Sequence, residues 1–190
     1  EHVSVTMEAA DLCPRFVARY VDGLSVGPSP LAIQLRLAAA GMRPVSNVVD
    51  ASNYVMLELG KPIHAFDAAA VADGHIVVRR AIEGEQLETL DHVTRTLTPD
   101  TLLIADARGP LGIAGVIGGA QSEVGGATSA VIVESAIFDP VSIRRTAQRN
   151  IVPWIMTSLP ESFNQLCQVG VRLRQRFAYE VVGDGLHFVH

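Results

Sequence analysis

Short strand-like segments dominate the middle of this chain and restrict the folds that it can adopt. They are rich in aliphatic and β-branched residues, and Gly, Asp or Pro separates each from the next. Strands this short bury their apolar faces only by pairing with strands distant in the sequence, so the pattern predicts a layered sheet. The expected strands are 75–80, 94–97, 102–105, 112–117 and 130–133.

The region before these segments predicts one further strand and two helices. The β-forming residues of 15–21 predict the strand. Ser29 and the proline after it precede an alanine-rich apolar run that ends at Gly41, which predicts a helix with Ser29 as its N-cap. A second helix is expected over 45–59, because Gly60 ends its apolar pattern.

A third helix follows the last strand and completes the expected architecture. Asp139 and the proline after it predict an N-cap and a first helical residue, and the pattern continues to Gln148. The fold class is therefore α+β: a layered β-sandwich with flanking helices. One domain over 1–149 accounts for these elements. The tail, 150–190, has a different composition, and a helix is expected there over 161–179.

Composition and charge limit the functions that fit the chain. Its 190 residues, 48% hydrophobic and 18% charged, suffice for a packed domain. The formal net charge of −5 argues against binding nucleic acid by bulk electrostatics. Cys13 and Cys167 show no metal-ligand spacing, which predicts free buried thiols. No segment has the pattern of an export signal or membrane span, so the cytoplasm is expected, and the start at Glu1 suggests a fragment.

A glycine-rich stretch at 112–119 resembles a nucleotide-binding loop only superficially. It lacks the Lys-Ser/Thr pair of a P-loop and does not open a helix with GxGxxG spacing. Small residues within a strand more often permit the close approach of another backbone or a ligand. The stretch therefore predicts one wall of a tight pocket.

Two ionisable residues are candidates for chemistry, and each also has a structural interpretation. His64 follows Pro62 in a short loop after the second helix, with Asp67 nearby. There it could transfer a proton or polarise a carbonyl, or serve only as a structural or exposed histidine. Glu134 ends an apolar strand, where it is either a buried carboxylate that needs a partner or a group at a solvated strand end.

Other polar residues carry weaker signals. Ser52 and Asn53 lie within the second helix, where such side chains usually face solvent or bond back to the helix. No histidine has ligand spacing that predicts a metal site, and no nucleophile elbow is present. The arginines of the third helix are interpreted as a helix surface in preference to a docking site; they are Arg144, Arg145 and Arg149.

Residues 52–67, which read SNYVMLELGKPIHAFD, resemble a signature segment of the bacterial phenylalanyl-tRNA synthetase β subunit. The resemblance continues in order and covers about 4–149. It implies the paired B3 and B4 modules of that family, a layered β-sandwich flanked by helices. The later segments that carry it are 76–81, 96–100, 113–119, 133–140 and 143–146.

The resemblance implies a pocket that edits tRNA by hydrolysing the ester of a wrong amino acid. By this resemblance, Glu134 and the strand that contains Ala114 and Gly115 would recognise the hydroxyl of tyrosine. His64 would lie near the ester, and Ser52 and Asn53 would help to line the pocket.

The chemistry of these residues agrees with that implied role. A buried carboxylate gains a charge-assisted hydrogen bond from tyrosine but is left unpaired by phenylalanine, so discrimination can be large. With no evident nucleophile, a positioned water would hydrolyse the ester of tyrosyl-tRNA specific for phenylalanine, without a covalent intermediate. No cofactor is expected.

The family pattern is lost after Arg149, where the family continues to a Thr-Glu-Ala-Ser motif that completes the editing pocket. A noncatalytic tRNA- or protein-binding module of the same fold is therefore the main alternative. A third hypothesis is an unrelated small-molecule hydrolase. No ATP-binding motif is present, so amino-acid activation is not expected. The implied partners are aminoacylated tRNA, the rest of the β subunit and the α subunit.

Overall fold

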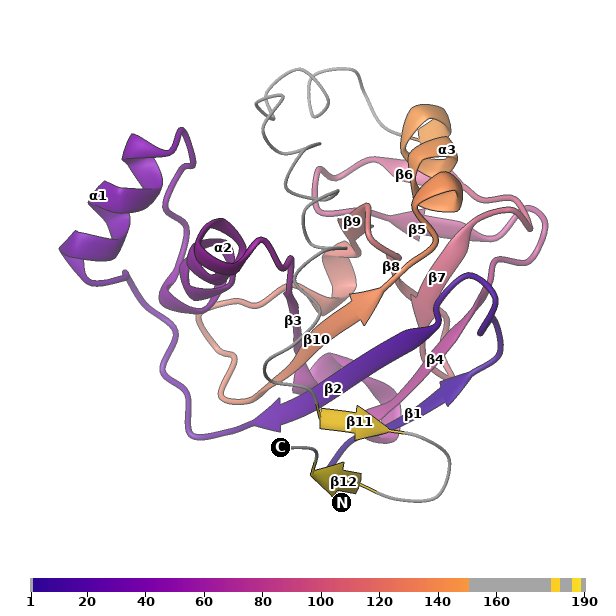
Figure 1. Cartoon of the computed structure of the whole chain (residues 1–190), viewed down its shortest axis with the longest axis horizontal. Coiled ribbons are helices and arrows are strands. Elements are labelled where there is room, and N and C mark those ends of the chain that lie inside the picture. Colours follow the sequence, from indigo (N-terminus) through magenta and orange to yellow (C-terminus); the bar gives the residue numbers. More distant parts are fainter. Residues whose placement is uncertain (1, 151–178, 182–185, 189–190) are drawn as a thin grey trace.

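Two β-sheets packed face to face form the body of the domain in the computed structural model, which describes residues 2–150, 179–181 and 186–188 (Figure 1). The larger sheet contains, in spatial order, β1 (Ser4–Met7), β4 (His75–Arg80), β7 (Leu102–Ala105), β8 (Pro110–Ile113) and β9 (Ile117–Gly118). The smaller sheet contains β2 (Arg15–Val21), β10 (Val131–Ile137) and β3 (His64–Asp67).

The main core lies between the two sheets, because each contributes one apolar face to it. Phe16, Phe66 and Ile132 extend into it from the smaller sheet, and Ile76 and Ile104 from the larger. All five are nearly or completely buried. Alternation of side chains along each strand places these residues on the inner faces. The predicted α+β sandwich is confirmed.

Strand β7 is buried on both faces, which explains its unbroken apolar sequence. Leu102 and Ile104 contribute to the core between the sheets, whereas Leu103 joins a second cluster on the other face. Leu87 belongs to that second cluster and lies in the hairpin formed by β5 (Gln86–Glu88) and β6 (Thr94–Thr96). The hairpin therefore covers the outer face of the larger sheet.

In the described part of the chain, three α-helices flank the sandwich, as predicted (Figure 1). Helices α1 (Leu31–Ala39) and α2 (Asn47–Leu59) lie in the connection between β2 and β3, and α3 (Pro140–Asn150) follows β10. Short 3-10 turns occupy Ala68–Ala70, Ala72–Gly74 and Ala120–Ser122.

The predicted N-cap at Ser29 is wrong. Pro30 occupies that position without a side-chain cap. The Ser29 hydroxyl instead donates a 2.6 Å hydrogen bond to buried Asp50, which also accepts from the backbone of Val45 at 2.8 Å. This tertiary bond between the start of α1 and the first turn of α2 replaces the local cap.

The ends of the other helices follow the sequence more closely. Helix α2 begins two residues later than predicted, with Ser46 as its N-cap, and ends at Gly60 in the left-handed conformation. Asp139 caps α3, because its carboxylate accepts from the backbone amide of Ser142 at 2.7 Å. That helix continues to Asn150, beyond its predicted end.

The expected strand over 112–117 is two strands joined by a turn. Gly115 has a φ of +64° between β8 and β9, and Val116 donates a 3.0 Å backbone hydrogen bond to Ile113. A left-handed residue costs little when it is glycine, so the chain reverses there. The resulting hairpin pairs Gly112 with Gly118.

The expected helix over 161–179 lies outside the described residues, except for Tyr179, which begins β11 (Tyr179–Val181). That strand pairs with β12 (Leu186–Phe188). Cys13 is a free buried thiol, as predicted, and Cys167 lies outside the described residues. In the part of the chain that the structure describes, no helix has the length and hydropathy needed to cross a bilayer.

Candidate functional site

Glu134 lies on the inner face of the smaller sheet, in the middle of β10. Its cross-strand partners are Ala18 on β2 and His64 on β3. Ile132 and Ala136, two residues away in each direction, contribute to the apolar core. Only 8% of the Glu134 surface is exposed. The interpretation of Glu134 as a group at a solvated strand end is therefore wrong, because β10 continues to Ile137.

His64 opens strand β3 and does not lie in a loop, which corrects the sequence-based placement. Its ring packs edge-on against Phe66, with centroids 4.6 Å apart. Part of its surface reaches solvent, but the imidazole is enclosed closely enough that burial lowers its pKa to about 4. At neutral pH the ring is therefore uncharged and can accept a proton or a hydrogen bond.

Asp67, the proposed neighbour of His64, is committed elsewhere. Alternation along β3 directs Asp67 and His64 to opposite faces of the sheet. The Asp67 carboxylate accepts from the Thr128 hydroxyl at 2.6 Å and from the Ala69 amide at 2.9 Å. It therefore stabilises the turn after β3 and does not orient the imidazole.

Gly118 forms a wall against His64, and this contact was not assigned from the sequence. A Cβ atom at Gly118 would lie 2.8 Å from Cε1 and 2.9 Å from Nε2 of the imidazole. Such distances are shorter than van der Waals contact, so only glycine allows the ring this position. The glycine-rich stretch therefore permits a close approach at Gly118, on β9, and its role as one wall of a pocket stays a prediction.

Lys61 is a second residue that sequence reasoning missed. Its ammonium donates a hydrogen bond to the carbonyl of Ala136, on the same strand as Glu134. Burial raises the pKa of Glu134 to about 7, and the positive charge of Lys61 opposes that rise. Burial likewise lowers the pKa of Lys61, which Glu134 partly counteracts. The carboxylate is thus poised between its neutral and ionised forms near neutral pH.

This environment predicts a stability difference between the wild-type chain and the Glu134→Gln variant that depends on pH. The folded chain binds the proton more tightly than the unfolded chain, whose Glu pKa is near 4.5. Wild-type stability relative to the variant should therefore fall as pH rises from about 4.5 through 7, by about 3 kcal/mol. Because the pKa of His64 is low, both proteins lose stability as the pH falls, and this shared loss cancels in the difference between them.

Urea unfolding at a series of pH values between 4 and 8 measures this difference. Because glutamine keeps the size of the side chain but does not ionise, the variant removes only the titration. Parallel stability curves for the two proteins would show that Glu134 is solvated.

Ala114 and Gly115 lie at the turn between β8 and β9, four and three residues before Gly118, respectively. Ala114 is buried in the core between the sheets, which also includes Ala18, opposite Glu134 on β2, and Ala136, two residues after it on β10. Gly115 faces a different direction, since a Cβ atom there would lie 2.9 Å from the Phe138 ring. The hairpin therefore brings Gly118, and not Gly115, against His64.

Ser52 and Asn53 lie on α2, which packs beside β3 (Figure 1). The Ser52 hydroxyl donates a 2.7 Å hydrogen bond to the carbonyl of Val49, the back-bonding expected of a serine within a helix. Roles for Ser52 and Asn53 at a site stay predictions. Within the described residues, no cluster of three His, Cys, Asp or Glu side chains is arranged to hold a metal ion.

The arrangement therefore defines a β-sandwich domain with an uncharged imidazole opposite a buried carboxyl group. A family profile described as the B3/4 domain matches residues 12–152. The chain belongs to this family.

Curated relatives are phenylalanine–tRNA ligase β subunits. The protein from Moorella thermoacetica is 53% identical over 146 residues, which cover 77% of this chain and 18% of the relative. That from Symbiobacterium thermophilum is 50% identical over 80% of this chain and 17% of the relative. That from Rhodopirellula baltica is 49% identical over 97% of this chain and 27% of the relative. The chain thus spans roughly a fifth to a quarter of their length.

A solved structure supports the fold. It is an N-terminal fragment of the phenylalanyl-tRNA synthetase β subunit from Pyrococcus horikoshii, with a TM-score of 0.53 over 90% of this chain and 49% of that fragment. Sequence identity is 15%, so the match concerns the architecture alone.

Proposed function

We propose that this chain is an editing domain that hydrolyses the ester of tyrosyl-tRNA specific for phenylalanine. The observation that supports this most strongly is the burial of Glu134 on an apolar face, where it is paired with His64 on the neighbouring strand. A carboxylate there is costly without a polar partner, and the hydroxyl of tyrosine would supply one. Phenylalanine would leave the group unpaired, which gives the site its selectivity.

Hydrolysis would use a water held beside the ester, with no covalent intermediate. The water oxygen attacks the ester carbonyl, and the bond to the ribose oxygen breaks to release tyrosine and free tRNA. The neutral imidazole of His64 accepts a hydrogen bond from that water and limits its orientation. Gly118 would hold the imidazole in place, since its missing side chain lets the ring sit against the β8–β9 hairpin.

The remaining parts of a synthetase would supply most of the contacts that hold the tRNA. Its relatives are β subunits several times longer, so the rest of a β subunit and an α subunit are proposed partners in the cytoplasm. The chain has a net charge of −5, which favours their contribution to holding the tRNA. Amino-acid activation is not part of the proposed function.

The direct test is single-turnover deacylation with the chain in excess over labelled aminoacyl-tRNA. Tyrosyl-tRNA specific for phenylalanine should lose its amino acid faster than phenylalanyl-tRNA, and His64→Ala should slow this by about 10² or more. Equal, background rates for both substrates, with tRNA still bound, would favour the noncatalytic binding module. Equal rates above background would contradict the role of Glu134.

A further inference from the structure

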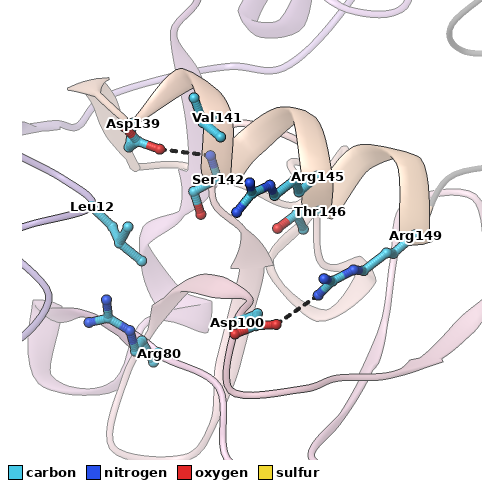
Figure 2. Close-up of a pocket in the computed structure, with 9 residues that line it drawn as sticks. All are labelled: Leu12, Arg80, Asp100, Asp139, Val141, Ser142, Arg145, Thr146 and Arg149. Carbon is cyan, nitrogen blue, oxygen red and sulfur yellow. Dashed lines mark hydrogen bonds and ion pairs between the residues drawn. The ribbon is translucent and has the colours of Figure 1, made fainter.

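A cavity at the edge of α3 lies apart from His64 and Glu134, and none of its lining residues belongs to that site. Its volume is about 230 Å³. Figure 2 shows the side chains that line it. Three arginines and two aspartates line it, together with two hydroxyl side chains. The lining residues that carry the argument are Arg80, Asp100, Asp139, Ser142, Arg145 and Arg149.

The helix presents two of the arginines one turn apart. Arg145 and Arg149 are four residues apart on α3, so both reach the same side of the helix. Arg80, at the end of β4, lines the pocket from the body of the sandwich (Figure 2). Thr146, next to Arg145 on α3, is buried, so this side of the helix packs against the domain. The cationic groups therefore extend from a helix and a strand around one cavity.

Two of these arginines form ion pairs that are easily exchanged. Arg149 binds Asp100 at 2.9 Å, and Arg80 binds Asp11 at 2.5 Å. All four side chains are substantially exposed, and ion pairs in such positions contribute little to stability. An anionic ligand could therefore recruit either guanidinium at small cost.

Arg145 is the charge in the pocket that the protein does not balance. Its side chain is exposed, and among the described residues it has neither a hydrogen-bond nor an ion-pair partner. The Asp139 carboxylate is occupied by the Ser142 amide and so caps the helix terminus. The pocket as a whole has an excess of positive charge, although the chain is acidic.

We propose that this pocket binds a backbone phosphate of an RNA strand, with Arg145 as its main ligand and Arg149 and Arg80 as exchangeable ones. Guanidinium groups suit this role because their planar donors match phosphate oxygens in pairs. The inference rests on the proposed function for the identity of the RNA, a tRNA. It also explains how an acidic chain contributes a local contact to a polyanion.

The test compares Arg145→Ala with Arg144→Ala, which removes the same charge from the adjacent exposed residue outside the pocket. Binding of fluorescently labelled, unacylated phenylalanine tRNA to the full chain is measured by anisotropy over a range of salt concentrations. Arg145→Ala should weaken binding about 5- to 10-fold at low salt and reduce the slope of log affinity against log salt by about 1. Arg144→Ala should change the affinity less than about 2-fold.

Further arms separate the alternatives. Arg145→Lys should restore part of the affinity, since it keeps the charge but loses the paired donors. Equal effects of the two alanine variants, or no salt-dependent binding by the wild-type chain, would overturn the proposal. The proposal would also be overturned if Arg145→Ala abolished the binding of inorganic phosphate but left the binding of tRNA unchanged. Because the tRNA is unacylated, a failure of hydrolysis does not affect the result.

Discussion

Replacing Glu134 with alanine is expected to abolish most of the preference for tyrosyl over phenylalanyl esters. In the proposed site, the buried carboxyl group of Glu134 is the side chain that would distinguish a phenol from a phenyl ring. A charge-assisted hydrogen bond is worth a few kcal/mol when the alternative is an unpaired group. The ratio of kcat/KM for the two substrates should therefore fall on the order of 100-fold.

The fold should survive this replacement, because the carboxyl group is poorly solvated in the wild-type chain, as its raised pKa indicates. Thermal unfolding checks this in parallel with deacylation. Glu134→Gln is the matched variant: its amide oxygen can still accept from the phenol, so it should keep part of the selectivity. If Glu134→Ala unfolds readily and the wild-type chain shows no measurable selectivity, Glu134 has a structural role.

The second large effect is expected for Gly118→Ala, whose new Cβ atom would occupy space that the His64 imidazole now fills. The φ of Gly118 is not in the left-handed region, so the conflict is with the ring and not with the backbone. The ring can rotate or shift, which spares the fold but displaces the group that we propose positions the water. A displacement of about 1 Å should slow deacylation on the order of 100-fold.

Gly126→Ala is the control for this substitution, because a Cβ atom there has no neighbour within 4 Å. Both variants remove one glycine, so their effects on the unfolded chain are matched. Deacylation rates at saturating chain concentration, together with thermal unfolding, separate the two effects. If both variants deacylate at the wild-type rate, the imidazole is not held by Gly118 in any way that matters for the reaction.

Local signals in the sequence were sufficient to predict the bounds of several elements. Strands β2, β4 and β7 have the predicted bounds, because continuous apolar or alternating segments and adjacent turn residues determine them locally. Asp139 and its following proline likewise predicted the start of α3. In contrast, β1 and β5 were not predicted, since such short strands depend on partners far along the chain.

The arrangement of the site depends on non-local pairing, which the local sequence does not encode. Glu134 is a polar residue that follows an apolar run, so it was interpreted as a possible strand end, although β10 continues past it. His64 was placed in a loop because Pro62 precedes it, whereas β3 begins there and pairs with β10. The signal for Gly118 was present in the glycine pair 118–119, but only the reversal at Gly115 brings it to His64.

The position of Glu134 on β10 also affects how the domain loses its structure. That strand is central in its sheet, with β2 on one side and β3 on the other, so its amides are enclosed on both edges. Amides in such strands exchange with solvent mainly through the largest openings of a protein. The carboxyl group is therefore carried by a segment that opens late, and partial unfolding at the periphery leaves it in place.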